Sequence, residues 1–265
     1  MISAKLIASR MRAGCMFRTV RHWWQGADGK TTARLFVFEL FVVSAGVLIA
    51  LGAEQLVSNW HWQGEVRDSD RRISDELGYD LVNAYERLAI KDCLEPRLAE
   101  LRDELIKGEP MWTGSRVRFA NDIYNPVFPP VYRTPNRPWP KDAWETALNG
   151  ETLGHFRPER VAVFAALFDE VSSLQRSQSE ELDLAASLGD LAFSGPISAS
   201  ERRANLKLVA KLGALNARIV FQSRLVLKNA ADVGLSPDRK GLKESLDQQR
   251  RYRGNCVRGP AKLAS

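Results

Sequence analysis

The sequence predicts an all-α protein in which an N-terminal transmembrane helix continues into an antiparallel helical bundle. The first observation is a run of 19 mostly apolar residues at 35–53 (LFVFELFVVSAGVLIALGA), with one charge and no proline. The second is the spacing of apolar residues after it, which recur at helical steps in long stretches separated by Gly and Pro. The third is the lack of any stretch with the apolar–polar alternation of a strand.

The apolar run is long enough to cross a lipid bilayer. A helix rises about 1.5 Å per residue, so the run spans about 28 Å, close to the ~30 Å hydrocarbon core. From Leu40 to Ala53 the only polar side chain is Ser44, whereas a buried core helix would keep a polar stripe. We therefore expect a transmembrane helix that has the lipid bilayer as its partner.

Two features inside the run bear on helix pairing. Glu39 lies about one turn from its inner end, where a carboxylate either reaches the interface or contacts a partner. Gly46 and Ala50 form a small-xxx-small step that permits close approach of a second helix. A homodimer formed through the span is one expectation from this pattern.

The distribution of charge predicts the orientation. Residues 1–34 carry seven Lys and Arg and a single acid, Asp28, whereas the residues just after the span are balanced. The positive-inside rule then places the N-terminus in the cytoplasm. We expect a bacterial inner-membrane protein with a cytoplasmic basic leader (1–34), a transmembrane helix and interface (35–62) and a helical periplasmic domain (63–265).

Alternatives remain open at the N-terminus. The apolar run also fits a cleaved signal peptide, although it exceeds the usual 7–15 residues. The leader is either an amphipathic segment lying on anionic lipid or a basic tail. The true start is Met1, Met11 or Met16.

The net charge of +6 does not point to nucleic acid. Nearly all of the excess lies in residues 1–34, and the domain after the span is close to neutral. The basicity is therefore a topology signal, and we expect no nucleic-acid partner.

The first helix of the outer domain is predicted over residues 65–107. Apolar residues fall on one face at steps of three, four or seven, and nothing breaks the chain between this helix and the span. Pro96 predicts a kink or a new helix start, and Gly108 predicts the end.

Further helices are predicted at 141–148, 161–191 and 238–251, and another runs to 233 from a cap at either Ser198 or Ser200. Asn-Gly, Ser-Gly-Pro and Gly-x-x-Pro breaks separate them. In the short helix 141–148, Trp144 and Leu148 are expected on one buried face. A group of carboxylates on the long helices is expected to form a solvated face: Asp169, Glu170, Glu180, Glu181 and Asp183.

Residues 109–140 contain seven prolines and interleaved aromatic residues, which exclude a long helix. Two interpretations are open for this Pro/aromatic-rich loop. The aromatic residues either cap the end of the bundle or form a partner-binding surface. The candidates for that surface are Trp112, Tyr124, Phe128, Tyr132 and Trp139.

The three cysteines divide between compartments. Cys15 precedes the span, whereas Cys93 and Cys256 follow it, where oxidation is permitted. We expect one disulfide between Cys93 and Cys256; two unpaired thiols are the alternative. No CxxC motif supports a redox or thiolate zinc site.

The sequence offers no recognisable catalytic or metal-binding pattern. It has three histidines, of which only His155 lies within the outer domain. GxSxG, GxGxxG and GxxxxGK[ST] motifs are absent. We expect no enzyme, no cofactor and no metal, and a surface or hinge position for His155.

Two short elements resemble a group of uncharacterised bacterial single-pass membrane proteins. The first comprises Glu39, the run Gly46-Val47-Leu48-Ile49-Ala50-Leu51 and Asn59-Trp60; the second is Trp144-Glu145-Thr146-Ala147-Leu148-Asn149-Gly150. Together they cover about 30 residues. The resemblance implies a membrane anchor and a helical outer domain with no assigned activity.

These expectations lead to a membrane-anchored, non-enzymatic envelope protein that acts by binding or scaffolding with an unidentified envelope partner. The alternative is a periplasmic ligand-sensing bundle that works through a separate membrane or cytoplasmic partner, because 34 inner residues are too few for an output domain. An enzyme of unrecognised type ranks third.

Overall fold

A computed structural model describes residues 29–117 and 129–259. Helix makes up 79% of the structure, with almost no strand, so the chain is all-α as the sequence predicts. The chain divides into two units, Met1–His61 and Trp62–Ser265. The predictions for the leader, the alternative starts and Cys15 lie outside the described residues.

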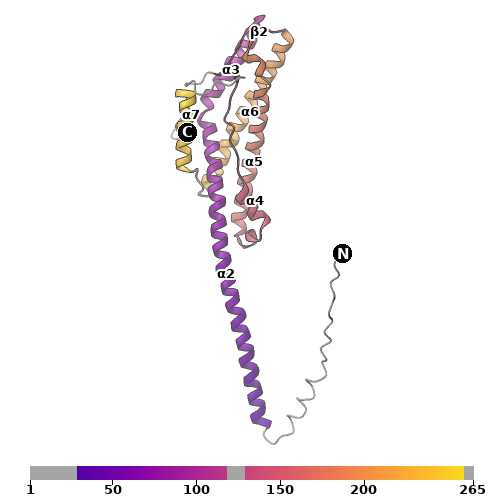
Figure 1. Cartoon of the computed structure of the whole chain (residues 1–265), viewed down its shortest axis with the longest axis vertical. Helices are drawn as coiled ribbons and strands as arrows, with labels where there is room; N and C mark the ends of the chain where they lie inside the picture. The colour runs from indigo at the N-terminus through magenta and orange to yellow at the C-terminus, as the bar shows by residue number, and fades with distance from the viewer. Residues whose placement is uncertain (1–28, 118–128, 260–265) are drawn as a thin grey trace, which may run out of the picture. The chain divides into compact units, whose positions relative to one another are not determined.

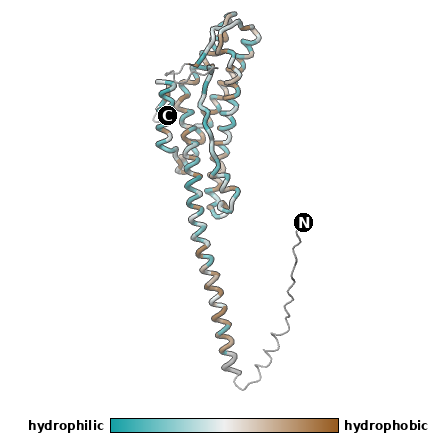
Figure 2. Tube along the Cα trace, in the orientation of Figure 1, coloured by the Kyte–Doolittle hydropathy of each residue, from teal (hydrophilic) through white to brown (hydrophobic). Residues whose placement is uncertain are grey.

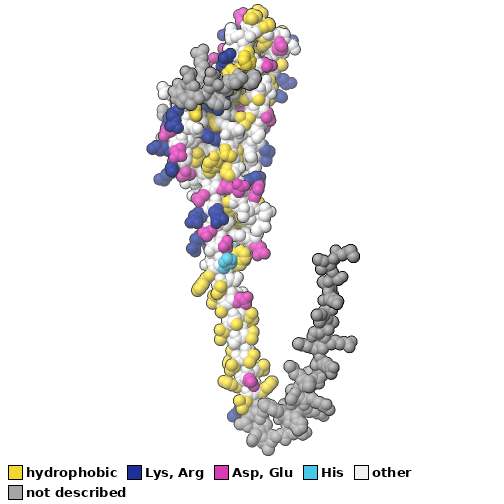
Figure 3. Space-filling model, in the orientation of Figure 1, with side chains coloured by type: hydrophobic (Ala, Val, Ile, Leu, Met, Phe, Trp, Pro, Cys, Tyr) yellow, Lys and Arg dark blue, Asp and Glu magenta, His cyan; other side chains and the backbone are white. Residues whose placement is uncertain are grey.

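Helix α2 (Gly29–Ala89) is continuous over 61 residues (Figure 1). The large apolar side chains from Leu35 to Val57 are between 50% and 72% exposed. Figure 2 shows that this stretch of α2 is mostly hydrophobic, and Figure 3 shows hydrophobic side chains along its visible face. Within the described part of the chain, it is the one helix long and apolar enough to cross a membrane by length and composition. Glu39 lies in this exposed stretch.

The C-terminal part of α2 belongs to the second unit and is buried there. From Ile73 onward its apolar face enters a core with α5 (Pro158–Ala186) and α6 (Ala199–Asp232). A second core cluster lies around α3 (Lys91–Lys107), and α6 packs along both α3 and α5. The long predicted helices therefore bury their apolar faces against one another.

The break between the first two helices differs from the prediction. The sequence placed it at Pro96, but α2 ends at Ala89 and α3 begins at Lys91, with Pro96 inside α3. The hydrogen-bond register changes at Ile90, whose carbonyl accepts from the N–H groups of Cys93 and Leu94. The predicted stop at Gly108 is confirmed, since this residue is the left-handed C-cap at φ +81°.

Strands β1 (Met111–Thr113) and β2 (Ser194–Pro196) form a short antiparallel pair that the sequence analysis missed. Trp112 lies opposite Gly195 in the pairing. Gly114 follows at φ +74°, and a Cβ there would lie 3.1 Å from the Ala192 carbonyl oxygen, so the turn requires glycine.

The short helix α4 (Asp142–Asn149) and the 3₁₀ turn η1 (Thr152–His155) lead into α5. Trp144 is buried and stacks on Phe168, as expected for a core residue. Leu148, however, is 52% exposed, so the prediction that it shares the buried face is wrong. The helix buries Trp144 and Ala147 instead, which are three residues apart.

Helices α6 and α7 (Arg239–Arg253) begin where their capping residues predict. Ser198 forms a capping box with Glu201 at the start of α6, and the Asp238 side chain accepts two backbone N–H bonds at the start of α7. Two 3₁₀ turns complete the unit: η2 (Gly189–Ala192) follows α5 and η3 (Gly254–Cys256) follows α7.

The structure joins Cys93 on α3 to Cys256 in η3 by a disulfide, with the Cα atoms 5.2 Å apart. This is the pairing expected from the sequence. The bond closes a loop of 163 residues that contains most of the second unit. It holds the segment after α7 on α3, where the Arg258 N–H also donates to the Ala89 carbonyl and Val257 is buried.

We predict that the Cys93→Ser/Cys256→Ser double variant loses about 2–5 kcal/mol of its free energy of unfolding, because a large covalent loop no longer constrains the unfolded chain. Thermal unfolding with and without reductant measures this. Reductant should lower the melting temperature of the wild type to that of the variant and leave the variant unchanged. A wild-type melting temperature insensitive to reductant would contradict the bond.

Candidate functional site

One stretch of α2 carries four polar residues into the interior of the second unit. These residues are Asp80, Asn83, Glu86 and Arg87, each at most 7% exposed. Helical spacing divides them: Asp80 and Arg87 continue the face of Ile73 and Leu77, whereas Asn83 and Glu86 share a neighbouring face. Burial of so many polar groups in about two helical turns marks this stretch as the centre of the candidate site.

Arg87 and Glu181 form a buried ion pair between α2 and α5, with side chains 8% and 1% exposed. The same Arg87 Nη2 donates to Asn216 Oδ1 on α6 at 2.7 Å, and the Tyr132 hydroxyl donates to Glu181 Oε1 at 3.1 Å. Burial raises the pKa of the Tyr132 phenol, and the Glu181 carboxylate raises it further, so this hydroxyl stays protonated. The cluster ties three helices to the loop.

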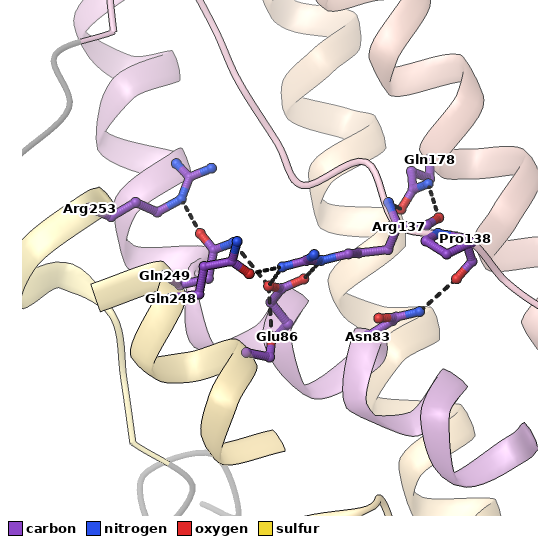
Figure 4. A network of polar contacts seen from close by, with 9 residues as sticks. Asn83, Glu86, Arg137, Pro138, Gln178, Gln248, Gln249 and Arg253 are labelled. Atoms are coloured by element: carbon purple, nitrogen blue, oxygen red, sulfur yellow. Dashed lines mark hydrogen bonds and ion pairs between the residues drawn. The ribbon is translucent and has the colours of Figure 1, made fainter. Parts of the chain in front are cut away.

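Glu86 is the centre of a second polar network (Figure 4). Arg137 holds both of its carboxylate oxygens in a bidentate pair, with Nε–Oε2 at 2.8 Å and Nη2–Oε1 at 2.7 Å. Ser245 Oγ and Gln249 Nε2, both on α7, also donate to Oε1. The bond to Glu86 raises the pKa of Arg137, so this guanidinium stays protonated.

The prolines around Arg137 are held by side chains of two helices. Asn83 Nδ2 on α2 donates to the Pro138 carbonyl at 2.8 Å, and Gln178 Nε2 on α5 donates to the Arg137 carbonyl at 2.8 Å (Figure 4). Proline lacks an N–H, so a proline-rich segment cannot form regular backbone pairing. At Arg137 and Pro138, side chains donate to the carbonyl groups instead. The polar residues therefore fix the path of the loop across the helices.

A cleft of about 770 Å³ lies beside these networks. We call it the proline cleft; it is bounded by residues 129–137, by the last turn of α5 with η2, and by residues 248–253 of α7. Its volume lies within the usual range for small-molecule sites. Three arginines line it (Arg133, Arg137 and Arg253), together with one acidic residue, Asp190, which is exposed.

Arg253 is half-buried and differs from Arg87 and Arg137, because no ion pair among the described residues includes it. Its Nε donates to Gln249 Oε1 at 2.8 Å and its Nη2 to the Arg133 carbonyl at 2.8 Å. Burial lowers its pKa to about 10, and the nearby Arg87 charge lowers it further. At neutral pH the cleft therefore contains a guanidinium charge without a carboxylate partner.

Asp80 is fully buried, and neither of its carboxylate oxygens has a hydrogen-bond partner among the described residues. Burial raises its pKa to about 8, and the neighbouring Glu76 raises it further. The folded protein therefore holds Asp80 protonated at neutral pH. Asp80 lies outside the proline cleft.

The structure contradicts one of the two interpretations of the aromatic loop, the partner-binding surface. Trp112, Tyr132 and Trp139 are 7%, 2% and 8% exposed and lie in the two core clusters. They pack as bundle-facing residues, so a partner-binding surface made of these side chains is wrong for all three. Tyr124 and Phe128 lie outside the described residues.

Two further expectations need correction. Glu181 is buried against Arg87, although the sequence assigned it with its neighbour Glu180 to a solvated face. Glu170 is half-buried and accepts from Asn229, and burial raises its pKa. His155, in contrast, is exposed, as expected for a surface residue, and its ring stacks on that of Trp62 with the centroids 3.9 Å apart.

Sequence reasoning missed the Glu86, Arg87 and Arg137 networks. A signal was present: Arg87 continues the apolar face of α2 at steps of three and four after Asp80 and Ala84. A charge on a core face requires a buried partner, but the sequence does not identify that partner, which lies 94 residues away.

The described residues contain no group of three or more His, Cys, Asp or Glu side chains arranged to hold a metal ion. The chemistry that the site supports is hydrogen bonding and charge pairing from guanidinium and amide groups. Comparison with protein-family models, curated proteins and solved structures finds no match.

Proposed function

We propose that the chain is a non-enzymatic, single-pass protein of the bacterial inner membrane whose helical periplasmic domain acts by binding. In this proposal residues 35–53 span the bilayer, the basic leader stays in the cytoplasm, and residues 63–265 form an antiparallel helical bundle outside. The observation that carries it is the exposed apolar surface of α2 around the whole helix. In water such a surface would be covered by another molecule, and lipid suits its length.

Other features support the same arrangement. The disulfide is stable only in an oxidising compartment, and the periplasm is one. The positive charges before the span and the balanced charges after it favour the same orientation. The proline cleft favours a small molecule as the bound species. In this proposal the domain senses that molecule, and a separate membrane or cytoplasmic partner transmits the signal.

A pair of double variants tests the anchor. Val43→Arg/Leu48→Arg places two charges in the proposed span, at a cost of about 2.5–3.5 kcal/mol each near its centre. Ile106→Arg/Leu148→Arg is the matched control, because these residues are equally apolar and exposed but lie in the second unit. After carbonate washing, the first variant should appear in the soluble fraction, and the control should stay in the membrane with the wild type.

A reporter enzyme that works only in the periplasm, fused to the C-terminus, tests the orientation. Activity is expected for the wild type. Release of the wild type by carbonate, or reporter activity confined to a cytoplasmic fusion, would overturn the proposal.

A further inference from the structure

The wall of the proline cleft formed by α7 presents hydrogen-bond donors. Glu86 accepts all the bonds at the inner end of the network. The side-chain Oε1 atom of Gln249 accepts from Arg253, and that of Gln248 accepts from Arg137. These bonds fix the orientation of both amides, because an acceptor oxygen leaves the amide nitrogen as the remaining donor. No hydrogen bond among the described residues uses Gln248 Nε2, and Gln248 lines the cleft.

Arg253 ends the same network at the cleft. Two of its three nitrogens are occupied, and no hydrogen bond among the described residues uses Nη1. Figure 4 shows its two Nη atoms turned away from the Glu86 end of the network. The cleft wall thus offers guanidinium and amide N–H groups to whatever occupies it.

The buried charges of the networks do not balance. Glu86 is paired with Arg137, and Glu181 with Arg87, which leaves Arg253 as a surplus positive charge. Arg253 is half-buried, and partial loss of solvent makes an unpaired charge less favourable, so one negative charge in the cleft would stabilise the protein. With Arg137 paired to Glu86, the remaining charged residues of the cleft lining are Arg133, Arg253 and the exposed Asp190. Their formal charges sum to one positive charge, which matches a monoanion better than a phosphate dianion.

The remaining walls are apolar. Pro129, Pro130 and Pro135 form one side, and Leu182, Ala185 and Phe193 lie on the other elements of the boundary. Such surfaces favour an apolar body attached to the charged group. The volume admits a small molecule of that kind.

We propose that the proline cleft binds a small organic monoanion, a carboxylate on an apolar body, with the carboxylate at Arg253 and Gln248. A guanidinium donates to a carboxylate in a planar geometry that an ammonium group does not match. The inference rests on the proposed function, because it names the ligand class that the periplasmic domain would recognise.

Phenylacetate is the probe, titrated by equilibrium dialysis against the full chain in phosphatidylcholine nanodiscs. Phenylacetamide has the same shape without the charge, and inorganic phosphate has charge without the apolar body. Binding of phenylacetate at least about tenfold tighter than either is expected, since one charge-assisted bond gives this factor. Equal binding of phenylacetate and phenylacetamide, or no binding of phenylacetate, would overturn the proposal.

Substitutions locate the bound probe. Gln248→Glu keeps the acceptor for Arg137 and replaces the Nε2 donor with a carboxylate oxygen, so it should weaken phenylacetate binding at least about tenfold. Arg253→Met should do the same, whereas Arg250→Met removes an exposed arginine one turn away and should leave binding unchanged. Thermal unfolding confirms that each variant is folded, and wild-type affinity in folded Gln248→Glu contradicts the site even if Arg253→Met does not fold.

The outcomes for the ligand class and for the proposed function are separable. Loss of the anchor in the carbonate and reporter experiments would refute the membrane arrangement whatever the probe does. Failure of phenylacetate to bind a correctly inserted protein would refute only the anion site.

Discussion

Glu181→Ala will lower the free energy of unfolding by about 3–5 kcal/mol, because it leaves the Arg87 guanidinium buried without its carboxylate. Glu180→Ala will lower it by about 0–1 kcal/mol, because Glu180 pairs with Arg218 on the surface, where both side chains are at least half exposed. The two residues are adjacent on α5 and chemically identical, so both substitutions change the helix propensity and the net charge by the same amount. Denaturant unfolding of the two variants measures the difference.

Several groups depend on Glu181 and explain the size of the effect. Arg87 Nε and Nη1 already lack acceptors among the described residues, so the loss of Glu181 leaves the guanidinium with Asn216 alone. The Tyr132 hydroxyl loses its acceptor as well. A buried polar group without a partner costs about 1–3 kcal/mol.

Replacement of both members of the ion pair separates the cost of an unpaired Arg87 charge from the contribution of the pair itself. Arg87→Met/Glu181→Leu replaces both charges by apolar groups of similar length and should recover much of the stability that Glu181→Ala loses. Equal losses for Glu180→Ala and Glu181→Ala would show that Arg87 is solvated and that the buried pair does not form in solution.

The elements that the sequence predicted well are those whose signals are local. Gly108 ends α3 because a left-handed residue is needed at that point, and Ser198 begins α6 because Glu201 three residues on completes a capping box. Both signals lie within a few residues of the boundary that they set. The strands β1 and β2 escaped prediction because three residues are too few for a periodic pattern.

The candidate site was beyond prediction for a different reason. Glu180 and Glu181 differ by 100° around α5, and which of them is buried depends on where Arg87 lies, 94 residues earlier. The proline cleft likewise combines the loop, α5 and α7, which are distant along the chain. Local pattern predicts the helices, but only their packing brings these groups together.

Asp80→Asn will stabilise the protein at neutral pH, and the gain will grow as the pH rises. In the folded state burial raises the pKa of Asp80 to about 8, whereas the unfolded chain has the ordinary value of 3.8. Between these values the folded state retains a proton that the unfolded state has released. The wild type therefore loses stability as the pH rises, by about 1.4 kcal/mol per pH unit from this residue.

The variant removes that dependence, because asparagine is close in shape to the protonated carboxyl group and does not titrate. Its advantage over the wild type should increase by about 2–3 kcal/mol from pH 5 to pH 7 and level off above pH 8. Denaturant unfolding at a series of pH values measures this difference.

Asp75→Asn is the matched control, since Asp75 is an exposed aspartate on the same helix. Its stability should run parallel to that of the wild type over the whole pH range, because this exposed substitution leaves the buried Asp80 carboxyl group in place. A curve for Asp80→Asn that also runs parallel to the wild type would mean that the Asp80 carboxyl group reaches solvent. The buried face of α2 would then be open to water at Asp80. The Arg87–Glu181 and Glu86–Arg137 networks on the next turns would lose the low-dielectric surroundings on which their energies depend.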